Sequence, residues 1–199
     1  MSIYRVKQYG LEQGALEIQY IEEFFGEFHR KKTATEIIAR LSGRDHLILM
    51  AEAPLPAEPS VMAPVAFKVA HELRKAESDP VLQDLVVRLR ESVPFGNQRI
   101  LYSWIGGTRR DWRGQGHFRA LTEQQEGWAL ERGFDQIVVK TKNKFYGMRS
   151  TLDRLGFDVI KFERYPAEDG ESKLYLSKKI SRDLVETHRT RRAVVEANR

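Results

Sequence analysis

The order of short apolar segments in the second half of the chain limits its possible folds more than any other feature. Ile100–Thr108 and Gln136–Lys140 are predicted strands, and the segment between them is long enough for a helix that Gly133 ends. Another helix follows, and strands at Phe157–Arg164 and Lys173–Lys178 complete the series around a polar turn. Strands joined through helices need parallel, right-handed crossovers. The order therefore predicts two β-α-β units in a mixed sheet with helices on its faces.

The first half of the chain adds three predicted strands, at Ile3–Tyr9, His46–Ala51 and Val65–Ala70. Prolines at four positions from Pro54 to Pro64 predict a loop there, because proline cannot donate a backbone hydrogen bond to a neighbouring strand. The whole order predicts an α/β fold, with a central mixed sheet of about seven strands flanked by helices.

Two helices are predicted between the first two strands, and one more lies in an insertion before the fourth strand. Thr33 begins the second helix, because Thr33-x-x-Glu36 matches a capping box, and Gly43 suits its C′ position. Asp79-Pro80 starts the helix of the insertion, which spans residues 71–99. Apolar residues at helical spacing define the buried faces, namely Leu16, Tyr20, Ile21, Phe24, Phe25 and Phe28 in the first helix and Val81, Leu82, Leu85, Val86 and Leu89 in the insertion.

Two more helices are predicted towards the C-terminus. The one before Gly156 buries Phe145, Met148, Leu152 and Leu155, and the last one, Ser181–Asn198, is basic and weakly amphipathic. A chain of 199 residues suits one ordinary domain with a sizeable core. We expect a single domain over residues 1–180, followed by a basic helix over residues 181–199.

Charge and composition exclude several functional classes. The net charge is +5, and much of it lies between Lys178 and Arg199, where there are seven Lys or Arg and three Asp or Glu, so charge alone does not favour a nucleic-acid partner. The absence of cysteine excludes disulfides, thiolate metal sites and cysteine nucleophiles. No set of His, Asp and Glu has metal-ligand spacing, so no metal is expected. No membrane span or leader is recognisable, and a cytoplasmic location is the default expectation.

A glycine-rich turn follows the predicted strand Ile100–Thr108 and opens the next helix. Two glycines there allow positive φ angles and let the backbone approach a ligand without an intervening Cβ atom. The first N–H groups of a helix have no intrahelical partner, and the helix dipole favours an anion at this end. The turn is therefore either a plain strand-to-helix connection or a cradle for phosphate or pyrophosphate. It comprises Arg113, Gly114, Gln115, Gly116, His117 and Phe118.

Arg113-x-x-Gly116 in this setting resembles the Arg/Gln-x-x-Gly-x-Gly/Ala motif of the GNAT superfamily of N-acetyltransferases. GNAT proteins also have a strand after that helix and then a short helix that ends in Leu-Gly-Phe. Gln136–Lys140 and Leu155-Gly156-Phe157 fall in those places. The resemblance covers about residues 65–180, and it implies a GNAT-like fold with acetyl-CoA as co-substrate.

The resemblance also implies which residues bind acetyl-CoA. Backbone groups of the strand before the turn would hold the pantetheine arm, and the turn would hold the pyrophosphate. Asn143 is available where an Asn is common in the family, and Phe118 replaces the last Gly/Ala of the motif and is expected to pack with Leu121 and Trp128. The ring of His117 is expected on the helix exterior. The strand residues are Ile105, Gly106, Gly107 and Thr108, where the glycine pair indicates either close ligand approach or an ordinary bulge.

Basic side chains gather near the turn and near the end of the following strand. They are consistent either with an anionic nucleotide or with a solvated basic loop. The residues are Arg109, Arg110 and Arg113, and Lys140, Lys142 and Lys144.

The catalytic groups are less clearly indicated. Many GNAT members have a tyrosine at the place of Leu152, where it protonates the leaving thiolate, and leucine cannot do so. Tyr146 is the alternative acid, unless it is a surface residue. His71 and Glu72 end the third strand and are either general bases or a solvated strand end. Ser103 and Tyr102 on the fourth strand either order a water molecule or are structural.

These features predict an acetyl-CoA-dependent N-acetyltransferase that moves an acetyl group to a primary amine by direct attack. One alternative is a non-catalytic acyl-CoA-binding or regulatory module on the same fold, which the missing tyrosine favours. Another is a basic nucleic-acid-binding protein. The acceptor can be a small molecule or a protein amine, no membrane partner is expected, and a homodimer is also considered.

Overall fold

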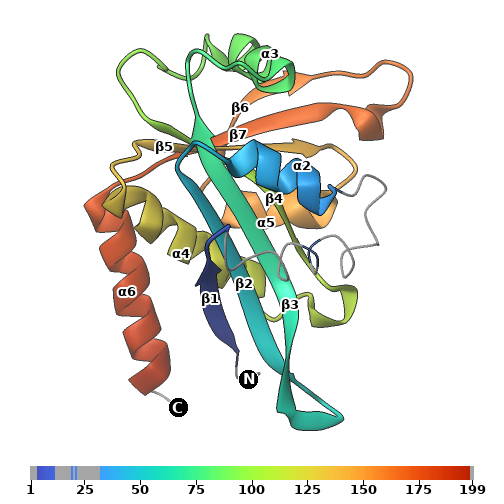
Figure 1. Ribbon diagram of the computed structural model, residues 1–199, viewed down its shortest axis with the longest axis vertical. Coiled ribbons are helices and arrows are strands. Elements are labelled where there is room, and N and C mark those ends of the chain that lie inside the picture. The colour runs from blue at the N-terminus through green and yellow to red at the C-terminus, as the bar shows by residue number, and fades with distance from the viewer. Residues whose placement is uncertain (1–3, 12–18, 20, 22–31, 198–199) are drawn as a thin grey trace. The chain divides into compact units, whose positions relative to one another are not determined.

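The structure is a computed structural model that describes residues 4–11, 19, 21 and 32–197 (Figure 1). Seven strands in these ranges form one mixed sheet in the order β1-β2-β3-β4-β5-β7-β6. The strands are β1 (Arg5–Tyr9), β2 (His46–Leu55), β3 (Glu58–Leu73), β4 (Ile100–Thr108), β5 (Gln136–Lys142), β6 (Asp158–Glu163) and β7 (Lys173–Lys179). The helices are α2 (Ala34–Leu41), α3 (Pro80–Leu89), α4 (His117–Glu131), α5 (Tyr146–Arg154) and α6 (Arg182–Ala197), with short 3₁₀ turns η1 (Arg110–Trp112) and η2 (Asp169–Glu171). The predicted α/β class and the mixed sheet of seven strands are confirmed.

The expectation of two β-α-β units is correct for only one of them. β4 and β5 are adjacent and parallel, with α4 between them in the chain. β5 and β6 are not adjacent, because β7 lies between them and is antiparallel to both. Burial explains this order: Leu174–Lys178 of β7 are buried without interruption, whereas β6 has a mostly exposed or half-buried pattern that suits a sheet edge.

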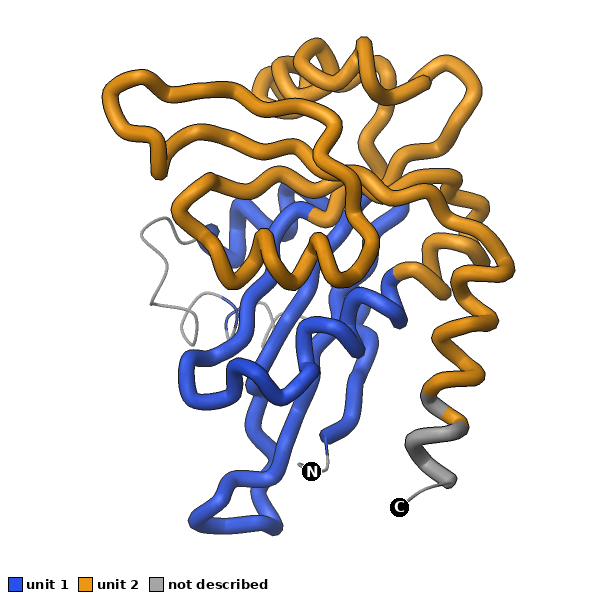
Figure 2. The backbone as a smooth tube through the Cα atoms, turned by 180° about the vertical axis from the view of Figure 1, so that it is seen from behind, with its two compact units in different colours: residues 1–71, 104–125 blue, residues 72–103, 126–199 orange. Residues whose placement is uncertain are grey.

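The chain divides into two compact units, Met1–His71 with Trp104–Gln125, and Glu72–Ser103 with Glu126–Arg199 (Figure 2). In the first unit, β1, β2 and β3 pair antiparallel. Its core contains Ile21, Ile37, Leu41, Ile48, Met50, Phe67 and Val69. The predicted helix over Leu16–Phe28 falls largely outside the described residues, and the single domain over residues 1–180 stays a prediction.

α2 begins as the sequence predicts. Thr33 accepts a hydrogen bond from the Glu36 N–H at 3.2 Å, and the Glu36 carboxylate accepts one from the Thr33 N–H at 2.9 Å. Gly43 follows the helix with a φ angle of 72°. The capping box and the glycine stop are both confirmed.

The predicted proline loop is wrong. Pro54 lies in β2 and Pro59 and Pro64 lie in β3, and only Pro56 falls in the tight turn between the two strands. β1 covers β2 only as far as Glu52, so Pro54 lies on a stretch whose other edge has no strand among the described residues. A missing N–H is tolerated on such an edge. Pro64 lies at a β-bulge, where the register shifts between Ala51 and Glu52 of the partner strand.

The second unit contains the insertion helix α3 and the strands β5, β7 and β6. Asp79 caps α3 by accepting hydrogen bonds from the N–H groups of Val81 at 2.8 Å and Leu82 at 3.3 Å. Leu82, Leu85, Val86 and Leu89 are buried as predicted, but Val81 is 62% exposed because the first turn of the helix faces solvent. In α5, Leu152 is fully buried, whereas Phe145 precedes the helix and is 44% exposed, contrary to the prediction.

Candidate functional site: the turn between β4 and α4

The second half of β4 lacks a partner strand on the β5 side. The register between β4 and β5 runs from Ile100 to Ser103 and ends there. Residues 104–108 belong to the first unit, where Arg109 N–H donates to the Val65 carbonyl of β3 at 2.9 Å. Within the described residues, one edge of Ile105–Thr108 therefore has no β5 partner, and its backbone groups can bond to an extended ligand.

The turn after β4 is built around two glycines with left-handed backbones. Gly114 has a φ angle of 77° and Gly116 one of 87°, as the sequence predicted. A Cβ atom added at either position would have no described atom within 4 Å. The space in front of both glycines is therefore open, and only the backbone conformation requires glycine there.

α4 starts directly after Gly116. Its first i→i−4 hydrogen bond runs from Ala120 N–H to Gly116 O at 3.0 Å, so the N–H groups of residues 117–119 precede that ladder. N–H groups outside the ladder and the positive end of the helix dipole together favour a phosphate group. The geometry of the turn is thus that of an anion cradle.

Gly106 has a packing reason of its own. A Cβ atom there would lie 3.1 Å from the Phe67 carbonyl oxygen and 3.3 Å from Cε2 of Phe118. The Phe118 ring also lies 4.4 Å from the Nζ atom of Lys68. Packing against Phe67 and Phe118 therefore explains the glycine at position 106 without a ligand, because a side chain there would crowd the Phe118 ring.

Lys68 is a residue that the sequence analysis missed. Its side chain is buried, with 2% of the residue exposed, and its Nζ atom donates to Thr122 Oγ1 at 2.7 Å. A lysine within the apolar run of β3 was the available signal, because a buried ammonium needs partners. Lys68 joins β3 to the first turns of α4 and so holds the start of this helix in place.

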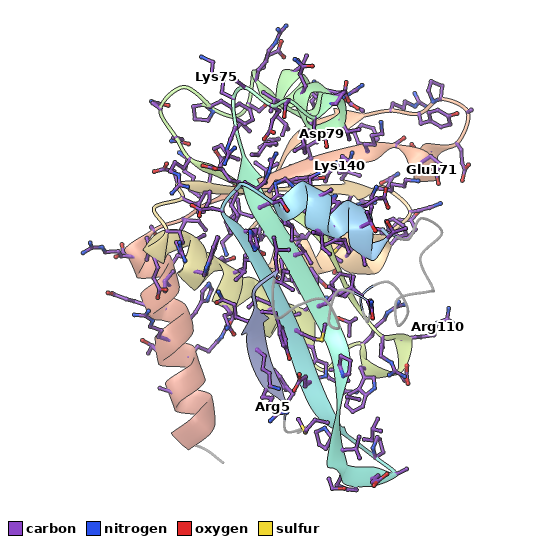
Figure 3. The ribbon with its side chains drawn as sticks, viewed as in Figure 1. Arg5, Lys75, Asp79, Arg110, Lys140 and Glu171 are labelled. Atoms are coloured by element: carbon purple, nitrogen blue, oxygen red, sulfur yellow. The ribbon has the colours of Figure 1, made fainter. Side chains whose placement is uncertain are left out.

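The arginines of the turn are mostly directed at backbone or solvent. Arg113 Nε donates to the Thr108 carbonyl at 3.1 Å, which closes the turn on itself. Arg109 lies 3.8 Å from the Asp111 carboxylate, and Arg110 is exposed and points outward (Figure 3). A basic rim around the cradle is therefore present, and the outward direction of Arg110 suits contact with a ligand.

His117 does not lie on the helix exterior, and that expectation is wrong. Only 1% of the residue is exposed, and its ring contacts the Tyr4 ring at 4.6 Å and the Trp112 ring at 5.9 Å between centroids. Neither ring nitrogen has a hydrogen-bond partner among the described residues. Burial lowers the pKa of His117 below its ordinary value, so the ring is neutral near pH 7. The site can use the His117 N–H group, while its ring anchors the helix start.

Asn143 has a structural role in the second unit. Its Nδ2 group donates to Asp169 Oδ2 at 2.7 Å, and its backbone N–H donates to the Ser172 carbonyl at 2.8 Å. Its Oδ1 atom accepts from Arg149 Nη1 at 2.5 Å. Both ends of the amide are thus engaged, and the side chain fixes the β5–α5 connection to the turn before β7.

The two predicted general bases differ in their surroundings. Glu72 pairs with Arg74 at 2.9 Å and with Arg99 at 3.0 Å. Burial alone would raise the pKa of Glu72, but the hydrogen bonds from both arginines outweigh it and hold the pKa below its ordinary value. His71 is fully buried, and its ring lies 5.7 Å from the Trp104 ring. Neither residue is a solvated strand end.

Tyr146 and the nearby lysines lie in the second unit. Tyr146 begins α5 and is 70% exposed, with the Arg149 guanidinium 5.6 Å from its ring. Lys142 and Lys144 both donate to the Glu171 carboxylate. Ser103 and Tyr102 are both buried on β4.

Two further kinds of site are absent from the described part of the chain. Residues 4–11, 19, 21 and 32–197 contain no group of three or more His, Asp or Glu that could hold a metal ion. No helix in the same ranges has both the length and the apolar character that a membrane crossing requires.

Comparison with solved structures identifies the fold. The ribosomal-protein-S18-alanine N-acetyltransferase of Escherichia coli superposes with a TM-score of 0.57 at 15% identity, over 90% of this chain and 95% of that one. Arabidopsis thaliana NAA60, solved with acetyl-CoA, gives a TM-score of 0.62 at 12% identity, over 89% and 99% of the two chains. A protein from Desulfovibrio desulfuricans assigned to the GNAT family gives 0.59 at 13%, over 90% and 100%.

Comparison by sequence alone gives no match to a known family or protein. No protein-family model matches the chain, and no curated protein matches it. The structural likenesses nevertheless show that the chain has the fold of GNAT acetyltransferases, as the glycine turn and the Leu-Gly-Phe motif predicted.

Proposed function

Starting from the GNAT fold, we propose that this protein binds acetyl-CoA and transfers its acetyl group to a primary amine. The observation that carries the proposal is the turn from β4 into α4. Gly114 and Gly116 have positive φ angles, and a Cβ atom added at either one would have no described atom within 4 Å. Gly116 directly precedes the N–H groups at the start of α4, and Gly114 lies two residues before Gly116. This combination suits a pyrophosphate.

The same segment of chain fits the rest of the cofactor. Ile105–Thr108 has one edge without a β5 partner, so its backbone groups can bond to the amides of a pantetheine arm. Arg110 lies just before the turn and Arg113 begins it, so both guanidinium groups can pair with phosphate oxygens. NAA60, one of the structural neighbours, is solved with acetyl-CoA. The cofactor supplies an activated thioester, and the chain supplies the alignment.

In the proposed reaction, the neutral amine attacks the thioester carbonyl, the carbon–sulfur bond breaks, and the thiolate takes up a proton. A fixed geometry for the two reactants can supply much of the rate, because well-oriented groups have a high effective molarity. We place His71 ahead of Glu72 as the general base, since the carboxylate of Glu72 is held by two arginines. Tyr146 stays the candidate acid.

One observation favours a second function. Leu152 is fully buried, so the helix has no acidic hydroxyl at the position where many GNAT enzymes carry tyrosine. A non-catalytic acyl-CoA-binding or regulatory module has no need for such an acid. A small-molecule or protein amine as the acceptor, a cytoplasmic location and a homodimer stay predictions.

Release of free coenzyme A thiol from acetyl-CoA, measured over a panel of small amines and peptide amines, tests the proposal. We expect turnover with at least one amine, and none with Gly116→Val. If Tyr146 is the acid, Tyr146→Phe lowers kcat by about 10²–10⁴-fold and leaves the acetyl-CoA affinity unchanged. Binding of acetyl-CoA without turnover on any amine would instead establish the regulatory module.

A further inference from the structure

A buried lysine lies against the first turns of α4, within the first unit. Lys68 of β3 is only 2% exposed, and its Nζ atom lies 2.7 Å from Thr122 Oγ1. Thr122 of α4 is fully buried, and its Oγ1 atom lies 2.8 Å from the Phe118 carbonyl oxygen. Lysine is rarely buried on a core strand, because its charged form needs polar partners there. The place of Lys68 therefore needs a reason beyond the packing of the sheet.

The donors available decide the direction of these two hydrogen bonds. A threonine hydroxyl has a single proton, and a carbonyl oxygen can only accept. The Thr122 proton is therefore directed at the Phe118 carbonyl, and Lys68 Nζ donates to Thr122 Oγ1. The result is a chain of hydrogen bonds that begins at the Lys68 ammonium and ends at the Phe118 carbonyl.

This chain ends on a peptide group of the anion cradle. The Phe118 carbonyl and the Arg119 N–H belong to one peptide unit, and the N–H groups of residues 117–119 precede the first i→i−4 bond of α4. A carbonyl that accepts a hydrogen bond polarises its peptide unit, and successive hydrogen bonds strengthen one another. The Lys68 ammonium therefore makes the Arg119 N–H a stronger donor to an anion.

Two unusual residues of the strand and the turn fit this arrangement. Phe118 stands where the glycine motif has Gly or Ala, and its ring centroid lies 4.4 Å from Lys68 Nζ, within cation–π distance. A Cβ atom at Gly106 would lie 3.3 Å from Cε2 of Phe118 and 3.5 Å from Cγ of Lys68. Gly106 therefore leaves room for both side chains, and Phe118 gives the ammonium an aromatic face that Gly or Ala does not have.

We propose that Lys68 is a positioning residue for the pyrophosphate of acetyl-CoA, on which it acts through Thr122 and the peptide group between Phe118 and Arg119. The inference rests on the proposed function, because it concerns the same ligand. Lys68 is too deeply buried to contact the ligand itself. The strength of a backbone cradle on α4 is thus set in part from β3.

Calorimetry of the full chain with acetyl-CoA tests this inference. Lys68→Met keeps a side chain of similar length without the charge, and Thr122→Val keeps the shape without the hydroxyl. We expect each variant to bind acetyl-CoA about tenfold more weakly, the lower end of what a charge-assisted hydrogen bond contributes. Thr122→Ser keeps the hydroxyl and should stay within about twofold of the native affinity. An equal loss in Thr122→Ser and Thr122→Val would assign the effect to packing and overturn the inference.

The matched control is Thr187→Val in α6. The Thr187 hydroxyl donates to the Asp183 carbonyl at 2.7 Å, which is the same bond to the preceding turn that Thr122 makes, but it is exposed and lies on another helix. Its removal should change the acetyl-CoA affinity by less than about twofold. A tenfold loss in this control would show that loss of such a bond in any helix weakens binding, and would contradict a specific role of Lys68 and Thr122.

A double variant tests whether Lys68 and Thr122 act as one chain. If they do, Lys68→Met/Thr122→Val loses about tenfold in affinity, as each single variant does, whereas independent effects multiply to about a hundredfold. The ligand 3′-dephospho-acetyl-CoA, which keeps the pyrophosphate, should lose the same factor as acetyl-CoA in every variant. A hundredfold loss in the double variant, or a loss confined to acetyl-CoA, would overturn the inference.

The native protein and the unliganded variants separate this inference from the proposed function. Native protein that binds acetyl-CoA, with folded variants that bind it equally well, would keep the proposed function and remove the role of Lys68. Folded native protein without acetyl-CoA binding would remove both. If circular dichroism shows that Lys68→Met does not fold, Thr122→Val and Thr122→Ser still decide the question, because both keep Lys68.

Discussion

The two halves of α4 differ in whether their polar groups have hydrogen-bond partners within the protein. At its start, the N–H groups of residues 117–119 precede the first i→i−4 bond, Gly116 has an open space before it, and both ring nitrogens of His117 lack a described partner. In its second half, the carboxylate of Glu126 is fully buried and both of its oxygens are bound. Lys178 of β7 donates to one at 2.8 Å, and His188 of α6 lies 2.6 Å from the other.

This difference separates a ligand site from a structural site. Buried polar groups are normally paired within the protein, so an end of a helix that leaves its donors open favours an external anion. A carboxylate whose oxygens bind a lysine and a histidine from two other elements stabilises the fold and has no capacity left for a ligand. If this distinction is correct, substitutions in the second half of α4 change stability, and substitutions at its start change affinity.

The largest expected effect is on stability, at Glu126. Glu126→Gln removes the charge that compensates the buried Lys178 ammonium, so we expect the free energy of unfolding to fall by about 3–5 kcal/mol. Urea denaturation measures this. Glu131→Gln on the same helix removes a pair with Arg189 in which the side chains are 69% and 67% exposed, and should cost less than about 1 kcal/mol. Similar losses in the free energy of unfolding for both variants would show that the buried Glu126 pairs stabilise the fold no more than an exposed ion pair does.

The next effect is on affinity, at Gly116. Gly116→Val brings a branched side chain into the space before the α4 N–H groups, so we expect at least about a hundredfold loss of acetyl-CoA affinity by calorimetry, or about 2.7 kcal/mol. Gly133→Val is the matched control, because Gly133 also has a positive φ angle, 71°, and no described atom within 4 Å of its Cβ position. Both variants carry the same kind of backbone strain. Equal acetyl-CoA affinity in the two variants would show that acetyl-CoA does not bind at the start of α4.

The smallest effect is a pH dependence at His117. Because burial lowers the pKa of this ring, the unfolded chain binds a proton near pH 6.5 that the folded chain does not. Stability is therefore fully present above about pH 6.5, and it falls as the pH drops from there towards the lowered pKa. His117→Phe, which can keep the contacts with Tyr4 and Trp112, should flatten this slope in melts between about pH 5.5 and 7.5. An unchanged slope would show that another group titrates.

Local signals in the sequence predicted much of this fold. The capping box of Thr33 and Glu36, the Asp79-Pro80 helix start and the bounds of Ile100–Thr108 all depend on residues close together in the chain. The conformations of Gly114 and Gly116 belong to the same class, because a positive φ angle is a local requirement.

The exposed Val81 and Phe145 are local failures, because both residues lie at the starts of their helices, but the other failures concern partners distant in sequence. The position of β7 between β5 and β6 depends on which strand can be buried on both faces, and the place of Pro54 depends on where β1 ends. The buried ring of His117 depends on Tyr4, which is far away in the chain, and the Glu126 network on Lys178 and His188. Single-sequence periodicity contains no information on such pairings.

The measurement that tests the central claim most directly is the melting temperature of the full chain with and without acetyl-CoA. Ligand at about 100 times its Kd adds about 2.7 kcal/mol to the free energy of unfolding. For a chain of this length, we therefore expect the melting temperature to rise by roughly 5–11 °C in the native protein and not in Gly116→Val. A folded native protein with no shift at millimolar acetyl-CoA would contradict the account.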